Sequence, residues 1–309
     1  SALYTEHELC KYAGNEENPY EILLSVTNAN LSTYTIHEDT KVIAYGAFEN
    51  CTRLAEIVIP DNVKSISSSA FYKRSTLTSV VIGDSVTSIG FQAFLGCSGL
   101  TSVTIGDGVS SIGGSAFYNC YSLNYLKLGN TIKTIGDYAF SGCESLSSVI
   151  LPDTVTQIGT SAFSNCIGLT SINIPNSVTM IGDSAFFGCI SLSNITIPNS
   201  VTEIGTSFFG CIGLKEFKGK FASSDGRCLI VDGVLNSFAP AGITSYTIPD
   251  GVTSIGNNAF DYCSSLTSIT IPDSVTSIGK WAFYECSSLT SVYCKATTPP
   301  AGDDYMFYH

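Results

Sequence analysis

The stretch SVTSIGFQAFLGCSGLTSV, residues 85–103, is one turn of a repeat that runs through most of this 309-residue chain. The phenylalanine of its Ala-Phe pair marks the period. This phenylalanine recurs in 23-residue steps from Phe48 to Phe186, and the same step separates Phe260 from Phe283. Self-similarity at a fixed period of this length predicts a solenoid, in which each unit buries its apolar side against its neighbours.

Each unit follows the pattern L-x-x-V-x-I-P-x-x-V-x-x-I-G-x-x-A-F-x-x-C-x-x. Its first segment, such as residues 100–105, is rich in Thr, Val and Ile and is typical of a strand. Pro or Gly followed by Asp or Asn then indicates a turn. The V-x-x-I-G segment is too short for a helix, and A-F-x-x-C allows at most one helical turn. We therefore expect a mostly β, right-handed solenoid of 23-residue coils, with one long parallel sheet and little helix.

The regular spacing is interrupted between Phe208 and Phe260. The copy TSFFGC before the gap lacks one residue, apparently the alanine, so that Phe208 takes the phenylalanine slot. The extra segment holds CLIVDGVLNSF, residues 228–238, whose central Asp-Gly predicts a β-hairpin. We expect a single solenoid made of an irregular capping unit (1–36), a first run of regular repeats (37–214), an irregular unit with the hairpin (215–248), and a second run with the C-terminal end (249–309).

The hairpin has two interpretations. It either interrupts or bends the stack, or it protrudes and binds a partner. The protruding residues would be Ile230, Val231, Asp232, Gly233 and Val234.

Composition excludes several classes of partner. The formal net charge is −12, and only 13 % of the residues are charged. Nucleic-acid binding and docking to anionic lipid both need clustered Lys and Arg, so we expect neither. No apolar run approaches the ~20 residues of a membrane-spanning helix, so we expect no direct membrane insertion.

Three segments carry a resemblance to a known family. They are LTSITIPDSVTSIGKWAFYECSSLTSV (266–292), RCLIVDGVLNSFAPAGITSYTIPDGVTSIG (227–256) and VYCKATTPP (292–300). They resemble the BspA-like leucine-rich repeat family of bacterial cell-surface and secreted proteins, several of which are described as adhesins. The resemblance implies a leucine-rich-repeat solenoid, an extracellular or cell-surface location, and non-enzymatic protein binding. It transfers no site residues, because the shared motif consists of core and turn positions.

Catalytic and metal-binding patterns are weak. The three histidines form no recognisable set with Ser, Cys or Asp, so we expect no enzyme and no cofactor. An acidic or amide residue follows the Pro or Gly of most coils, and we interpret it as an Asx-turn that bonds the backbone two residues on. A Ca²⁺ ladder is the alternative, but one oxygen ligand per coil is few for Ca²⁺. We therefore expect no metal site. The slot holds Glu38, Asp61, Asp84, Asp107, Asn130, Asp153, Asn176, Asn199, Asp250 and Asp273.

The outward strand positions are mostly Ser and Thr, with one local departure. Asn124, Tyr125, Lys127 and Ile150 bring apolar and charged side chains to adjacent coils. They form a possible protein-binding patch, since interface hot spots combine such groups. Neutral drift on a solvated face is the alternative.

A second column follows the phenylalanine slot, and its aromatic and apolar residues either pack on neighbouring coils or form a second sticky surface. We expect Trp281, next to this column, to be half exposed. The column includes Tyr72, Leu95, Tyr118, Phe187, Phe209 and Tyr284.

One cysteine recurs three residues after the phenylalanine. Arg74 fills this slot in one coil without breaking the repeat, so no fixed partner is required there. Stacked side chains of one column point the same way, and free cysteine packs as a small hydrophobe. We therefore predict a column of buried thiols rather than disulfides. The cysteine column comprises Cys51, Cys97, Cys120, Cys143, Cys166, Cys189, Cys211, Cys263 and Cys286.

These features together predict an extracellular, adhesin-like module that binds host or bacterial surface proteins through the solenoid surface. The alternative is a structural spacer or display stalk of a larger cell-surface protein. The two would differ in whether the outward face carries a contiguous apolar or charged patch.

Overall fold

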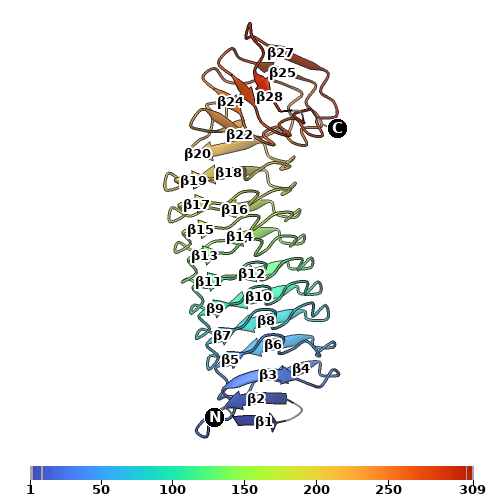
Figure 1. The fold of residues 1–309 in the computed structure, drawn as a ribbon, viewed down its shortest axis with the longest axis vertical. Helices are drawn as coiled ribbons and strands as arrows, with labels where there is room; N and C mark the ends of the chain where they lie inside the picture. Colours follow the sequence, from blue (N-terminus) through green and yellow to red (C-terminus); the bar gives the residue numbers. More distant parts are fainter. Residues whose placement is uncertain (1–2, 8–9, 304, 308–309) are drawn as a thin grey trace.

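The computed structural model describes residues 3–7, 10–303 and 305–307. Within these residues every regular element is a strand, and none is a helix that could cross a membrane. The coils stack along the long axis of the molecule from the N-terminus to the C-terminus (Figure 1). The predicted mostly β, parallel solenoid of 23-residue coils is confirmed, and its right-handed sense stays a prediction.

Antiparallel strands cover the N-terminal end of the stack. β1 (Leu3–His7) pairs with β2 (Cys10–Gly14), which pairs with β3 (Ile22–Val26). β3 then pairs in parallel with β5 (Val42–Ile43) of the first regular coil. These antiparallel strands cover the first coil, with β1 as the terminal strand of the sheet, and we propose that residues 1–36 act as the cap.

Each coil of the first run supplies one longer and one shorter strand on two sides of the rod. The shorter strands join β1–β3 in one continuous eleven-stranded sheet. They are β5 (Val42–Ile43), β7 (Ser65–Ile66), β9 (Ser88–Ile89), β11 (Ser111–Ile112), β13 (Thr134–Ile135), β15 (Gln157–Ile158), β17 (Met180–Ile181) and β19 (Glu203–Ile204).

The longer strands do not form the single long sheet that the sequence predicts. They divide into the sheets β4–β12, β14–β16 and β18–β20, so pairing stops between β12 and β14 and again between β16 and β18. These strands are β4 (Thr33–Thr35), β6 (Glu56–Ile59), β8 (Ser79–Ile82), β10 (Ser102–Ile105), β12 (Tyr125–Lys127), β14 (Ser148–Ile150), β16 (Ser171–Asn173), β18 (Asn194–Ile197) and β20 (Glu216–Gly219).

The Ala-Phe segments form a third side without strands. The amide of Phe117 donates to the carbonyl of Ala139 in the next coil at 2.8 Å. Ser115 and Asn119, two residues before and after Phe117, have φ of 54° and 58°, in the left-handed region. Their amides also donate to the next coil. This backbone therefore turns a corner and still pairs with its neighbour.

The buried phenylalanines stack on one another through the core. Consecutive ring centroids from Phe48 to Phe208 lie 4.4–5.7 Å apart, with nearly parallel planes. Phe208 occupies the slot as predicted, but the shortened copy has not lost its alanine position. Ser207 fills this position, because its carbonyl accepts the amide of Phe186. One coil earlier, the carbonyl of Ala185 accepts the amide of Phe163 in the same way. The missing residue is the left-handed one that Ser184 supplies one coil earlier.

The cysteine column lies inside the core, as predicted. From Cys97 to Cys211, each column thiol donates to the carbonyl of a phenylalanine in the preceding coil, at 3.1–3.4 Å. Cysteine is small, apolar and a weak donor, and so fits a core slot that faces a carbonyl. Arg74 instead donates from its guanidinium to the carbonyls of Glu49 and Tyr72.

The second run has its own core and its own sheets. In its five-stranded sheet, β21 (Cys228–Val231) pairs antiparallel with β22 (Val234–Phe238), and β22 pairs in parallel with β24 (Ser254–Ile255). The remaining strands are β26 (Ser277–Ile278) and β28 (Ala301–Gly302) of this sheet, and β23 (Ser245–Thr247), β25 (Ser268–Ile271) and β27 (Ser291–Cys294) of another. Figure 1 shows these coils turned relative to those of the first run.

Asp232 and Gly233 both have positive φ at the hairpin turn, at 49° and 80°. Two positive φ values match the twist of the flanking strands, which explains the Asp-Gly pair. Ile230, Val231 and Val234 are half-buried. The hairpin therefore lies within the stack, with Asp232 exposed at its turn, rather than standing clear of it.

Candidate protein-binding surface

The break between β12 and β14 lies where the sequence departs from the repeat. Leu126 in β12 is only partly buried, whereas Val103 and Val149 in the same slot of the neighbouring coils are buried. Leu128 and Leu151 replace the isoleucine that usually ends the segment. Leucine favours a strand less than β-branched isoleucine does, and β12 and β14 are both one residue shorter than β10.

Asn124, Tyr125, Lys127 and Ile150 all line one surface hollow of about 360 Å³ at this break. The Tyr125 side chain is 54 % exposed, and that of Ile150 is 82 % exposed. The structure thus brings the four predicted residues together, and we call them the sheet-break patch. Their role in binding stays a prediction.

The patch offers apolar area, a phenol, an amide and an ammonium beside two strand edges. Among the described residues, no group of three His, Cys, Asp or Glu side chains could hold a metal ion. The arrangement suits recognition of another polypeptide.

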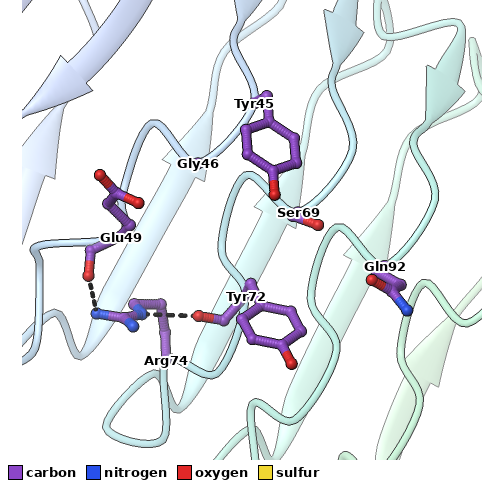
Figure 2. A pocket seen from close by; sticks show the side chains of 7 residues that line it. All are labelled: Tyr45, Gly46, Glu49, Ser69, Tyr72, Arg74 and Gln92. Carbon is purple, nitrogen blue, oxygen red and sulfur yellow. Dashed lines mark hydrogen bonds between the residues drawn. The ribbon is translucent and has the colours of Figure 1, made fainter.

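A second groove lies beside the Ala-Phe corners of the N-terminal coils, and sequence reasoning did not identify it. It encloses about 570 Å³ between Tyr45, Tyr72 and Gln92. Figure 2 shows both tyrosine rings beside it, with Arg74 held by the carbonyls of Glu49 and Tyr72. Two features of the sequence could have indicated this groove. They are Tyr45, three residues before Phe48, and Arg74 in the cysteine column.

The acidic column has a different partner from the predicted one. Asp61 Oδ1 accepts the amide of Asp84 at 2.7 Å, and Asp84 Oδ1 accepts that of Asp107 at 2.9 Å. The predicted bond within each residue's own turn is therefore wrong here, because the same slot of the next coil presents its amide more closely. A second column, which follows the I-G pair, makes the same kind of bond between coils. In it, Asp137 Oδ1 accepts the amide of Thr160.

The Ser and Thr residues of the outer face also bond between coils. Thr101 Oγ1 donates to the carbonyl of Thr78 at 3.0 Å, and Thr170 Oγ1 donates to that of Ser147 at 3.1 Å. Their hydroxyls therefore serve the stack, in addition to facing solvent.

Comparison with known proteins decides the family. The family model of the BspA type leucine-rich repeat region matches residues 25–147, 110–224 and 235–309. The chain belongs to this family. A comparison with curated proteins finds no match.

The solved structures that resemble this BspA-type chain include two leucine-rich proteins. A leucine-rich cell surface protein from Faecalibacterium prausnitzii is 30 % identical, over 95 % of this chain and 76 % of that one, with a TM-score of 0.74. The leucine-rich repeat protein of T. pallidum is 27 % identical, over 71 % of this chain and 99 % of that one, with a TM-score of 0.53. The predicted family and leucine-rich-repeat fold are thereby confirmed.

Proposed function

We propose that this BspA-type chain is an extracellular, non-enzymatic module that binds proteins of host or bacterial surfaces in an adhesin-like manner. The sheet-break patch carries the proposal. Ile150 and Tyr125 expose large side chains beside two strand edges, on a face otherwise rich in Ser and Thr. The similarity to a protein described as a leucine-rich cell surface protein supports the location.

The burial of the repeated side chains supports a non-enzymatic role. The cysteine and phenylalanine columns are in the core, and the Asp61–Asp84–Asp107 carboxylates already accept backbone amides. Catalysis needs groups that converge on a substrate in a cleft. The sheet-break patch instead combines the apolar, aromatic and charged groups of a protein interface.

The double variant Tyr125→Ser/Ile150→Ser tests this function. Labelled protein is titrated onto cultured epithelial cells and onto intact anaerobic bacteria. We expect binding to whichever surface the wild type recognises to weaken roughly 10- to 30-fold, since loss of a hot spot removes about 2 kcal/mol. Circular dichroism should be unchanged, because both side chains face solvent.

Val58→Ser is the matched control, because Val58 occupies the slot of Ile150 within a continuous sheet and is 60 % exposed. It should bind like the wild type. Undiminished binding by the folded double variant would refute the role of the patch. A wild type that binds neither surface would favour a spacer or display stalk.

A further inference from the structure

An aromatic cleft lies where the first run meets the second. Phe187 and Phe209 come from the last coils of the first run, and Tyr262, Trp281 and Tyr284 come from the second run. The irregular unit between the two runs has no A-F-x-x-C segment, so the stack of Ala-Phe segments on the third side of the rod is interrupted there. The cleft encloses about 470 Å³, within the roughly 300–1,000 Å³ typical of ligand pockets.

The rings are arranged in pairs and present accessible surface. Phe187 and Phe209 lie 4.5 Å apart between ring centroids, and Tyr262 and Tyr284 meet edge to face at 5.7 Å. Tyr262 and Trp281 are each 41 % exposed, in agreement with the half exposure predicted for Trp281. Rings that served only to pack one coil on the next would be buried, so the exposed ring surface of Tyr262 and Trp281 is available to a ligand.

Asp261 also lines the cleft, in the slot after the phenylalanine that elsewhere holds aromatic residues, leucine, serine or, in the first coil, Glu49. It is only 7 % exposed, and its Oδ1 has no hydrogen-bond partner within the described part of the chain. Burial raises the pKa of this carboxyl to about 7, helped by nearby Glu285 and opposed by the Tyr262 amide. A buried carboxylate oxygen without a partner is destabilising unless a positive group approaches it.

We propose that the aromatic cleft binds an alkylated ammonium group, with Trp281, Tyr262 and Tyr284 around the cation and Asp261 as its counter-ion. Ring faces attract cations whose charge is spread over methyl groups, and the attraction grows when water is excluded. A cation of the chain itself already makes such a contact with Trp281. Lys280 does not line the cleft, and its Nζ lies 4.1 Å from the centroid of Trp281.

Trp281 is the only tryptophan of the chain, so its fluorescence reports occupancy directly. The probes are tetramethylammonium, choline, and 3,3-dimethylbutan-1-ol, the neutral isostere of choline. We expect both cations to change the emission with saturation, and the neutral isostere to bind at least about 10-fold more weakly. Equal binding of choline and its isostere would overturn the proposal and leave a purely apolar cleft. An emission unaffected by either cation would also overturn it.

The variant Asp261→Asn tests the contribution of the counter-ion to binding separately from that of the apolar walls of the cleft. It keeps the shape of the side chain, and we expect choline affinity to fall roughly 10-fold while affinity for the isostere is unchanged. Asp250→Asn is the control, as Asp250 is exposed in the same run. Cation binding should strengthen from pH 6 to pH 8 as Asp261 ionises, with Tyr262, Cys263 and Glu285 as the other titratable groups around it. If Asp261→Asn binds choline like the wild type, Asp261 is not the counter-ion.

Discussion

Replacing Phe117 with alanine is expected to lower the free energy of unfolding by about 3–5 kcal/mol. Phe117 is fully buried, with its ring 5.1 Å from that of Phe94 and 5.3 Å from that of Phe140. Each coil of a solenoid contacts only its neighbours, so no distant element can refill the space. Urea denaturation followed by circular dichroism measures the change.

Tyr121→Ala is the control in the same coil. Tyr121 is among the exposed aromatic side chains, and its loss should change the free energy of unfolding by less than about 0.5 kcal/mol. A loss below about 1 kcal/mol for Phe117→Ala would show that the phenylalanine stack does not hold the coils together.

The thiols of the cysteine column are expected to react with an aromatic disulfide reagent at least about 1,000-fold more slowly than an ordinary thiol. Burial raises the pKa of Cys97 and of Cys166 to about 12. At pH 8 this lowers the fraction of reactive thiolate by about three orders of magnitude compared with a pKa of 9. Exposed Cys294 should react in a fast phase of one thiol, and all 12 cysteines should react after denaturation without reductant.

The variant Cys294→Ser should abolish this fast phase and leave the slow one unchanged. Several fast thiols in the native protein, or fewer than 12 after denaturation, would contradict a column of buried thiols. The raised pKa values also set a pH dependence. Above about pH 9 the unfolded chain releases thiol protons that the folded chain retains, so the free energy of unfolding should fall as pH rises.

The repeat made much of the fold predictable. Slots that recur every 23 residues see the same surroundings in every coil, so one unit such as 85–103 defines its strands, its turn and its core side chains. The burial of Cys97 and the use of Phe208 in the shortened copy follow from the same periodicity. The local sequence pattern was sufficient to predict the structure wherever a coil repeats its neighbour.

Features that depend on contacts between coils were harder to predict. The Asp61 side chain accepts the amide of Asp84, which is 23 residues away, so a turn rule based on local sequence gave the wrong donor. The sheet break between β12 and β14 coincides with the incomplete burial of Leu126 between the neighbouring coils. No single segment contains that information.

The candidate sites differ in the same way. The sheet-break patch was visible in the sequence, because Tyr125 interrupts a column of serines and Ile150 follows on the adjacent coil. The aromatic cleft was only partly visible, because Phe209 and Asp261 are 52 residues apart and belong to different runs. The distance between its two walls depends on the irregular unit, which follows no repeat.

We expect that the repeated positions maintain the fold, while the sheet-break patch binds the partner. A consensus variant tests it directly. It carries the sequence of 101–105 in place of 124–128, together with Ile150→Thr and Leu151→Ile. Continuous β-branched strands should close the break between β12 and β14 and raise the thermal unfolding temperature.

The decisive measurement is the binding of this consensus variant to the cell surface that the wild type recognises, with amide hydrogen exchange reporting whether β12 and β14 have become protected. We expect a more stable protein with a closed sheet and binding weakened at least about 10-fold. A closed sheet with wild-type binding would contradict this expectation.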